Sequence, residues 1–288
     1  MRPDDWHLTE DLDDFLARAG DFLRSRPALH TIALTVTEAL RTRGADAYGA
    51  ESPTFGWLER AGEVNAAFFR TPPRRLILTP LTADEADSLA AHLAGLSPLL
   101  PGVTADHDTA TAFAEAWEQH TGATPTLHER ERLYRLGTLM APEPLPEGRG
   151  RVACERDREH LITWYREFVD AIGAVGPADP GSWADTRIAS GRVTFWENAD
   201  GTPVSMAGVT PMVAGQIRVA PAYTPAHLRG RGYAGAATVE VTRAALTAGA
   251  AEVLLFADLA NPTSNGLYQR IGYRPVTDFA VYDFSPAA

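Results

Sequence analysis

Hydrophobic residues recur along the chain with two periods, which predict a mixture of helices and strands. In the first half, apolar residues spaced three and four apart predict helices, and short apolar runs between polar turns predict strands. The predicted helices are 11–26, 28–42, 83–96 and 109–120, and the predicted strands are 54–60, 65–70, 75–81, a short strand near Val103, and 132–139. Thr82 is expected to cap the third helix.

A similar order returns in the second half. The predicted strands are 151–154, 192–198, 204–212, 216–223, 253–259 and 273–284, and the predicted helices are 157–172, 232–248 and 262–271. Residues 253–257 read Val-Leu-Leu-Phe-Ala, a continuously apolar run that is typical of a central strand covered on both faces. The repeated order indicates a diverged internal duplication.

The segment 140–150 separates the two halves. It contains three prolines and two glycines with little apolar content, which is typical of an interdomain linker. We therefore predict an N-terminal domain at 1–141, a linker at 142–150 and a C-terminal domain at 151–288. The predicted fold class is α+β, with a mixed and mostly antiparallel sheet flanked by helices in each domain.

Arginine supplies all 26 basic residues, because the sequence contains no lysine. This absence removes the lysine of phosphate-cleaving P-loop proteins and the Schiff-base lysine of pyridoxal-phosphate enzymes. With 37 acidic residues the net charge is −11, which disfavours nucleic acid as a partner and mildly favours a cationic substrate. The single cysteine, Cys154, excludes an internal disulfide, and we expect it to be buried as a small hydrophobe.

Several other classes of protein lack support in the sequence. No apolar run approaches the ~18 residues needed to span a bilayer, and the first residues are polar and acidic. We therefore expect a soluble, cytoplasmic protein with no membrane partner. No G-x-S-x-G, H-E-x-x-H or paired His and Cys spacing occurs, so a serine hydrolase or a zinc enzyme has no motif, and we assign no metal site.

The stretch 229–235, Arg-Gly-Arg-Gly-Tyr-Ala-Gly, allows two interpretations as a phosphate-binding loop. Counted from Gly230 it matches the dinucleotide pattern G-x-G-x-x-G, with Asp258 downstream, and counted from Arg229 it matches R-x-x-G-x-A. Only 58 of the 288 residues follow Gly230, too few for the remaining strands of a doubly wound nicotinamide-binding domain. In either interpretation, glycines without Cβ atoms and free N–H groups at the start of a helix favour a bound pyrophosphate.

The segments 222–224, 229–234 and 261–273 together resemble the GNAT superfamily of acyl-CoA-dependent N-acyltransferases. The resemblance extends from about residue 151 to residue 284. It is only topological in the N-terminal half, because no R-x-x-G-x-A loop follows Leu81. It implies two tandem GNAT-like domains, a layout similar to that of mycothiol synthase, in which the N-terminal copy is degenerate and shapes the acceptor cleft.

The resemblance implies acetyl-CoA as co-substrate and the primary amine of a small molecule as acceptor. By the resemblance, the pantetheine arm lies along the strand before the loop, and the loop holds the pyrophosphate. The implied cofactor-binding residues are Ala222, Tyr223, Thr224, Arg229, Gly230, Arg231, Gly232, Tyr233, Ala234 and Asn261. Pro221 cannot donate to a ladder and predicts a bulge or a splayed edge at this strand. Asn261 before Pro262 is also a good helix N-cap.

Four residues are candidates for the chemistry of acyl transfer, one as the acid and three as the base. In relatives, a tyrosine at the place of Tyr268 donates a proton to the departing thiolate, and a phenol can serve this purpose. A carboxylate acting through water usually removes the proton of the amine, and Glu167 and Glu197 are the candidates, with Asp170 beside them. Trp164, Tyr165, Phe168, Trp183 and Trp196 either line an acceptor pocket or pack the core.

Two other functions stay open at the level of sequence. A non-catalytic acyl-CoA-binding or scaffolding module would keep the loop without an acceptor site. The lack of a unique general base leaves this function open, whereas Tyr268 and Asn261 argue against it. A NAD-dependent oxidoreductase would use the dinucleotide pattern. The acyl chain length and the oligomeric state, monomer or homodimer, are open as well.

Overall fold

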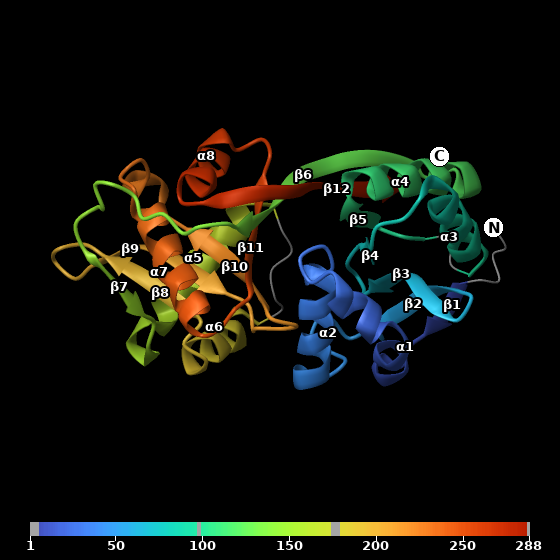
Figure 1. Ribbon diagram of the computed structural model, residues 1–288, viewed down its shortest axis with the longest axis horizontal. Helices are drawn as coiled ribbons and strands as arrows, with labels where there is room; N and C mark the ends of the chain where they lie inside the picture. The colour runs from blue at the N-terminus through green and yellow to red at the C-terminus, as the bar shows by residue number, and fades with distance from the viewer. Residues whose placement is uncertain (1–5, 97–98, 174–178, 287–288) are drawn as a thin grey trace. The chain divides into compact units, whose positions relative to one another are not determined.

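A computed structural model describes residues 6–96, 99–173 and 179–286. The chain forms two compact units (Figure 1). Unit 1 takes in Met1–Leu133, Asp258–Ala260 and Val276–Ala288, and unit 2 takes in Tyr134–Ala257 and Asn261–Pro275. The segment 142–150, predicted as a linker, lies inside unit 2, and its last two residues open a strand.

Unit 1 contains a sheet with helices from the first half of the chain. Its elements are β1 (Trp6–Thr9), α1 (Leu12–Ser25), α2 (Thr31–Arg43), β2 (Thr54–Arg60), β3 (Glu63–Arg70), β4 (Leu76–Leu78), α3 (Ala83–Leu96), β5 (Gly102–Asp106), α4 (His107–Thr121) and the first part of β6 (Thr124–Leu136). The strand order is β1-β2-β3-β4-β5-β12-β6, in which the later part of β12 (Tyr273–Ser285) pairs with β5. The β4–β5 pair is parallel, and the pairs β1–β2, β2–β3, β3–β4 and β5–β12 are antiparallel.

Unit 2 repeats this plan. Its elements are β7 (Arg149–Val152), a 3-10 turn η2 (Glu155–Asp157), α5 (Arg158–Ala171), α6 (Pro180–Ala189), β8 (Val193–Glu197), β9 (Pro203–Val209), β10 (Gln216–Tyr223), η3 (Ala226–Leu228), α7 (Tyr233–Thr247), β11 (Glu252–Asp258) and α8 (Pro262–Arg270). The strands run β7-β8-β9-β10-β11, and β6 follows β11. The three pairs from β7 to β10 are antiparallel, and β10–β11 is parallel.

The same order of elements therefore occurs twice. In each unit two helices follow the first strand, three strands form a meander, and a helix, a strand, a helix and a long strand follow. The predicted α+β class, with a mixed and mostly antiparallel sheet flanked by helices, is confirmed. A doubly wound parallel sheet, which the dinucleotide interpretation needs, is not the fold of unit 2.

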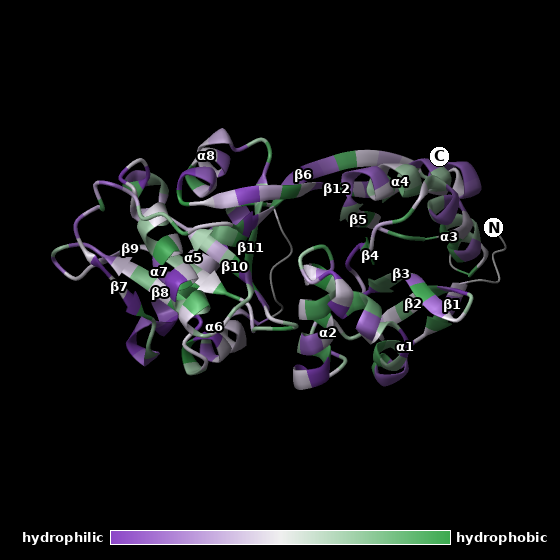
Figure 2. Cartoon of the chain, viewed as in Figure 1, coloured by the Kyte–Doolittle hydropathy of each residue, from purple (hydrophilic) through white to green (hydrophobic). Residues whose placement is uncertain are grey.

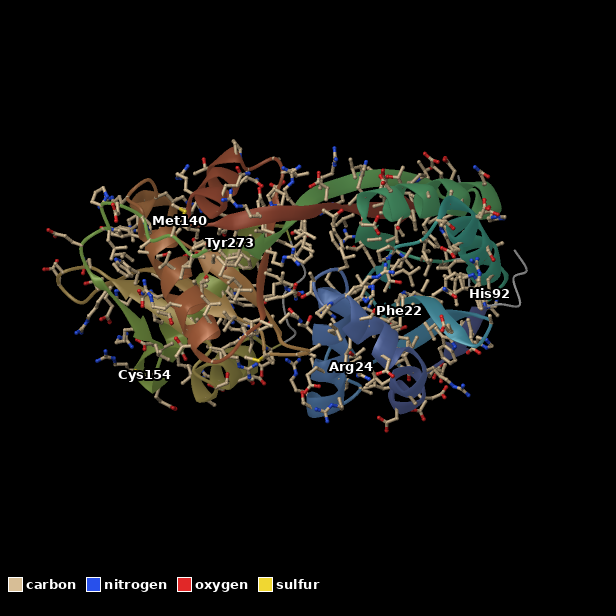
Figure 3. The ribbon with its side chains drawn as sticks, viewed as in Figure 1. Phe22, Arg24, His92, Met140, Cys154 and Tyr273 are labelled. Atoms are coloured by element: carbon tan, nitrogen blue, oxygen red, sulfur yellow. The ribbon has the colours of Figure 1, made fainter. Side chains whose placement is uncertain are left out.

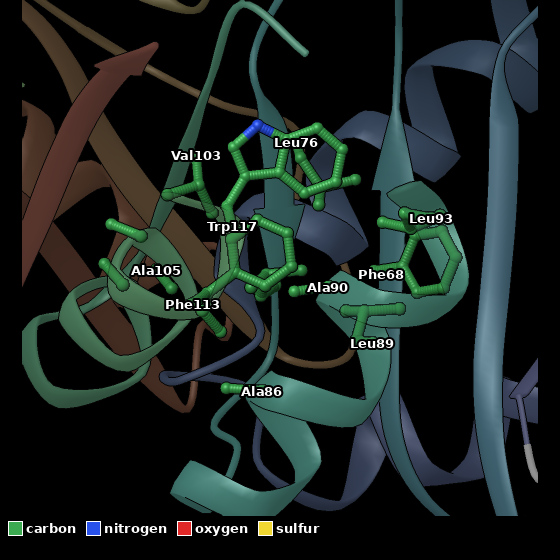
Figure 4. Packing of buried hydrophobic residues seen from close by; sticks show 14 of the residues in the cluster. Phe68, Leu76, Ala86, Leu89, Ala90, Leu93, Val103, Ala105, Phe113 and Trp117 are labelled. Carbon is green, nitrogen blue, oxygen red and sulfur yellow. The ribbon is translucent and has the colours of Figure 1, made fainter. Parts of the chain in front are cut away.

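Each unit has its own hydrophobic core. In unit 1, Trp117 and Phe113 of α4 pack with Phe68 of β3 and Leu89 of α3, and all four are almost fully buried (Figure 4). Figure 2 shows hydrophobic and hydrophilic positions alternating around the turns of α1 and α2, as expected for helices that cover a sheet. Burial of each large side chain stabilises the fold by about 1.5–3 kcal/mol.

In unit 2, small residues bring α7 onto the sheet, where it packs across β8, β9 and β10 (Figure 1). The three- and four-residue spacing of small residues predicts a packed face at Ala234, Ala237, Val241, Ala245 and Ala248. Ala237, Val241 and Ala245 are buried as predicted, whereas Ala234 is half-buried and Ala248 is exposed. Tyr273, labelled in Figure 3, is fully buried at the start of β12, and its hydroxyl lies 2.7 Å from that of Thr242 on α7. The alanine face of α7 thus lets its axis lie close to the sheet.

Three elements differ from the sequence-based expectation. The strand β1 and the helix α6 were not predicted, and β6 begins at Thr124 instead of residue 132. The first part of β6 carries charged residues instead of an apolar alternation. Two of its arginines, Arg130 and Arg132, pair with Asp278 of β12, so ion pairs along the strand replace the expected hydrophobic signal.

No helix among the described residues is long and apolar enough to cross a membrane. Within the same described ranges, no group of three or more histidine, cysteine, aspartate or glutamate side chains is arranged to hold a metal ion.

Candidate active site

The glycine loop leads into the first turn of α7. Gly230 and Gly232 have φ angles of +75° and +81°, in the left-handed region that favours glycine. A Cβ atom at Gly230 would meet no other atom within 4 Å, so this position borders open space. Residues 229–232 are exposed. Backbone conformation therefore requires both glycines, and the loop leaves the helix start accessible.

The N-terminus of α7 has free amide groups. Gly232 is the N-cap and supplies no side-chain hydrogen bond. The amide of Ala236 bonds to the carbonyl of Gly232 at 3.1 Å and begins the helical ladder, which leaves the amides of the three preceding residues without helical acceptors. Arg231 beside this turn has no ion pair among the described residues. Free amides, a helix dipole and arginine together suit a phosphate group.

The strand before the loop separates from its parallel neighbour. Residues 216–218 of β10 pair with 252–254 of β11, and no described pairing of the two strands continues beyond Arg218. On the other edge, the pairing of β10 with β9 shifts register between Val219 and Ala222, where Pro221 stands. The predicted bulge at Pro221 is confirmed. The later part of β10, from Val219 to Tyr223, thus offers an unpaired edge to an extended ligand.

Buried hydroxyl groups fix the end of β10. Ser205 on β9 donates from Oγ to the carbonyl of Tyr223 at 3.0 Å, and its Oγ lies 2.8 Å from Oγ1 of Thr224. Arg229 donates from Nε to the carbonyl of Thr224 at 3.0 Å, which ties the loop to the strand. Ser205 was not predicted as a site residue. Its only sequence signal is a polar side chain at an inward position of a strand.

The helix α8 brings Asn261 and Tyr268 to the same region. Asn261 caps α8, because its side chain accepts from the amide of Ser264 at 3.0 Å, so its predicted structural role is confirmed. A Cβ atom at Gly235 of α7 would lie 2.9 Å from Cδ1 of Leu267. This glycine therefore allows α8 to approach the first turn of α7 closely, next to the glycine loop.

Tyr268 packs against two other tyrosine rings, those of Tyr134 at 6.5 Å and Tyr273 at 6.2 Å between centroids. Burial raises the pKa of Tyr268 to about 12. No hydrogen bond to its hydroxyl group occurs among the described residues of either unit. Near neutral pH this group is a protonated phenol that is free to donate a hydrogen bond.

The structure brings the predicted base Glu167 to the predicted cofactor strand. Tyr223 at the end of β10 donates from its hydroxyl to Oε2 of Glu167 on α5 at 2.8 Å. Burial, followed by this hydrogen bond, raises the pKa of Tyr223. The ring of the buried residue Trp164 packs against that of Tyr223, with 6.0 Å between the ring centroids. A carboxylate, a phenol and an indole therefore meet beside the unpaired end of β10.

Glu197 has a different environment. Its side chain is only 3% exposed, and Oε1 accepts from Nε of Arg151 at 2.5 Å, while Arg149 lies 3.5 Å from Oε2. The hydrogen bond from Arg151 holds the pKa of Glu197 below its ordinary value. Such a carboxylate is a weak proton acceptor, which favours Glu167 over Glu197 as the base.

Most of the other aromatic residues that were candidates for an acceptor pocket pack against neighbouring side chains. Trp164 and Trp196 are almost fully buried in core clusters. Tyr165 stacks on Trp183 of α6 with 3.6 Å between ring centroids, and both rings are half-buried. Trp183 sits on a helix that the sequence did not predict, so the stacked pair was not foreseen.

The expectation for Cys154 was wrong. The thiol is exposed, because Cys154 precedes the turn η2 and donates from Sγ to Asp157 at 3.2 Å. The same aspartate accepts from the amide of Cys154 at 2.8 Å. Local capping of a turn, not burial, explains this residue.

Comparison with known proteins supports the fold. No family model matches the sequence, and no curated protein matches it. Solved structures do match. A GCN5-related N-acetyltransferase from Sphaerobacter thermophilus has a TM-score of 0.63 at 19% identity, covering 98% of this chain and 96% of its own. A GNAT-family acetyltransferase from Colwellia psychrerythraea has a TM-score of 0.61 at 10% identity, covering 97% and 99%.

A third similar structure is a tandem GNAT protein from the clavulanic acid biosynthesis pathway. Its TM-score is 0.58 at 14% identity, and the match covers 98% of this chain and 99% of that one. The chain therefore has the fold of the tandem GNAT N-acetyltransferases over nearly its whole length, and the predicted resemblance is confirmed at the level of the fold.

Proposed function

We propose that unit 2 is an N-acetyltransferase, which transfers an acetyl group from acetyl-CoA to the primary amine of a small molecule by direct attack in a ternary complex. The observation that carries this proposal is the open N-terminus of α7 beside the unpaired end of β10. The N-terminus of α7 suits an anionic diphosphate, and the unpaired end of β10 suits an extended polar arm.

The proposed cofactor-binding residues form two groups, one for the diphosphate and one for the pantetheine arm. The amides of Gly232, Tyr233 and Ala234 would bind the diphosphate, together with the side chains of Arg229 and Arg231. The backbone of residues 222–224 would bind the pantetheine arm, since β11 leaves this edge unpaired. Asn261 uses its carbonyl oxygen as a cap, so its amide NH₂ would donate to the arm.

The chemistry needs two proton movements. Acetyl-CoA supplies a thioester, and the amine forms a new N–C bond to the acyl carbon while the C–S bond breaks. Glu167 takes the proton of the amine through a water molecule, and Tyr268 donates to the departing thiolate sulfur. Since the pKa of Tyr268 is raised to about 12, the phenol stays protonated at neutral pH and acts mainly as a hydrogen-bond donor.

The acceptor is proposed to be a cation before it reacts. Glu167 is exposed and carries the one carboxylate that touches the end of β10 among the described contacts. A net charge of −11 attracts a cationic molecule to the protein.

Thiol release from acetyl-CoA, measured with a panel of primary amines, tests the proposal. We expect turnover with at least one amine and about a 100-fold lower kcat in Tyr268→Phe, with an unchanged affinity for coenzyme A. Tyr282→Phe is the matched control, because this half-buried tyrosine of unit 1 bonds to Thr111 and takes no part in the proposed site.

Other outcomes would change the assignment. Coenzyme A binding without turnover across the panel would favour the scaffolding module. Thermal stabilisation by NAD and not by coenzyme A would contradict the proposal and restore the oxidoreductase.

A further inference from the structure

Tyr134 joins the strand β6 to the helix α8 inside unit 2. Its side chain is fully buried, and its hydroxyl group donates to Oδ1 of Asn265 at 2.7 Å. The same hydroxyl group accepts from Nε2 of Gln269 at 3.1 Å. Asn265 and Gln269 lie on one face of α8 in successive turns, because they are separated by one helical repeat. One phenol thus bonds to two turns of the same helix.

The direction of these hydrogen bonds is fixed by the helix itself. Nδ2 of Asn265 donates to the carbonyl oxygen of Asn261 at 2.8 Å, so Oδ1 is the atom that faces Tyr134. An amide oxygen only accepts, and the single hydrogen of the phenol is therefore given to Asn265. The bonds form one chain along α8, which comprises Gln269, Tyr134, Asn265 and Asn261. This chain ends at the N-cap, whose side chain is a proposed ligand of the pantetheine arm.

The helix α8 has little burial to hold it in place. It has nine residues, and none of them is fully buried. Helices shorter than about 12 residues are marginal in water without tertiary contacts. The position of α8 therefore depends on the side chains that hold it, among them Leu267 against Gly235 and the two that bond to Tyr134.

Tyr268 lies next to this anchor. It directly precedes Gln269, and its ring packs against that of Tyr134 with 6.5 Å between centroids. The hydroxyl hydrogen of Tyr134 is engaged with Asn265, whereas the hydroxyl group of Tyr268 has no hydrogen bond among the described residues. The two phenols therefore have different tasks, since one holds the helix and the other can donate to a ligand.

We propose that Tyr134 is a positioning residue for acetyl transfer, because its hydroxyl group ties α8 to β6 and thereby fixes the place of the Tyr268 hydroxyl group. The inference rests on the proposed function, in which Tyr268 donates to the departing thiolate. Misplacement of a catalytic group by about 1 Å can lower a rate about 100-fold. Loss of the anchor in a helix that keeps its other contacts should cost less.

A double-mutant cycle tests whether Tyr134 acts through Tyr268. Tyr134→Phe keeps the ring and removes both hydrogen bonds, and we expect kcat to fall about 10-fold while the KM for acetyl-CoA changes by less than about 3-fold. In the Tyr268→Phe background the same change should lower kcat by less than about 2-fold, because the positioned group is already absent. A merely structural role would lower kcat equally in both backgrounds.

Hydrogen exchange tests the anchor without any turnover. In Tyr134→Phe the amides of residues 265–270 should exchange about 5- to 10-fold faster, the effect of one net hydrogen bond, and those of α7 should not change. Tyr273→Phe is the matched control, because this buried tyrosine also packs against Tyr268 but its hydroxyl group bonds to Thr242 on α7. It should leave exchange in α8 as in the wild type.

If the wild type is active, three results would overturn this inference alone. They are unchanged exchange in α8 of Tyr134→Phe, an unchanged kcat in the same variant, and equal losses of kcat in the two backgrounds. Absence of turnover in the wild type would overturn the proposed function and, with it, the role of Tyr134.

Discussion

The two units share an order of elements and differ at the start of one helix. In unit 1, α3 follows the strand β4, and a capping box closes its N-terminus. Thr82 accepts from the amide of Glu85 at 3.3 Å, and the carboxylate of Glu85 accepts from the amide of Thr82 at 2.9 Å. In unit 2, the equivalent helix α7 begins at Tyr233, and its N-cap Gly232 provides no side-chain hydrogen bond.

The difference shows that two repeats of one fold can have the start of the same helix capped in one unit and uncapped in the other. A capping box satisfies the free amides of a helix with the protein's own groups and places a negative charge there, which repels phosphate. Glu85 also pairs with Arg60 at 3.0 Å. A glycine cap leaves the amides to an external anion. We therefore regard α3 as stabilised for folding and α7 as free for a ligand.

The largest expected effect concerns Glu167, whose carboxylate on α5 contacts the end of β10. Glu167→Gln should lower kcat about 100-fold while the affinity for coenzyme A stays the same, because the variant removes the proton acceptor and keeps the size of the side chain. Steady-state kinetics with the best amine of the panel measures this. Equal kcat values for Glu167→Gln and the wild type would remove Glu167 from the mechanism.

The second prediction makes α7 resemble α3. Ala234→Glu places a carboxylate at a half-buried position in the first turn of α7. We expect the affinity for coenzyme A to fall at least about 10-fold through repulsion of the diphosphate. Ala234→Gln is the matched neutral control and should cost less. Calorimetric titration measures both. Equal losses in the two variants would indicate that bulk, not charge, is responsible.

The third prediction concerns Glu197, the other candidate base. Glu197→Gln should destabilise the protein by ~1–3 kcal/mol, since a buried group bonded to Arg151 loses its charge. It should also leave the pH profile of kcat unchanged, in contrast to Glu167→Gln. Denaturant unfolding and pH-dependent kinetics test the two parts. A kcat loss with unaltered stability would reverse the roles of the two glutamates.

Glu197 is also expected to make the stability of the protein depend on pH. The folded pKa of Glu197 lies below its ordinary value of 4.5, so its contribution is present above about pH 4.5 and is lost as the pH falls through the folded pKa. The wild type should therefore lose stability on acidification faster than Glu197→Gln. Parallel acid-unfolding curves would contradict this.

The smallest effect is expected at α3. Glu85→Gln keeps a capping side chain but loses the ion pair with Arg60, and we expect a loss of about 0.5–1 kcal/mol in stability. No coenzyme A binding should appear in unit 1, since Thr82 still caps the helix. Thermal unfolding with and without coenzyme A measures both. Binding of coenzyme A to unit 1 in Glu85→Gln would show that the negative charge of Glu85 alone prevents binding at the start of α3.

Local features of the site could be predicted from the sequence. The bounds of β10 and the N-cap at Asn261 follow from apolar runs and from turn chemistry. The glycine loop follows from the same local signals. The bond between Tyr223 and Glu167 could not be predicted, because 56 residues separate its partners and only the packing of α5 brings them together.

The missed elements have physical reasons too. The helix α6 begins with Pro-Gly, and of its residues only Ala184 is fully buried, so little apolar pattern marks it. The strand β6 is stabilised by ion pairs to Asp278, which a hydrophobic pattern does not reveal. Cys154 was expected in the core from its residue type, and a local turn overrode that preference.

One measurement tests the central claim most directly. Coenzyme A is added to ¹⁵N-labelled protein, and the amide resonances of Tyr233 and Ala234 in α7 are compared with those of Asp84 and Glu85 in α3. We predict large, saturable shifts in α7 and none in α3. Unchanged α7 amides at saturating coenzyme A, or shifts confined to α3, would contradict the account.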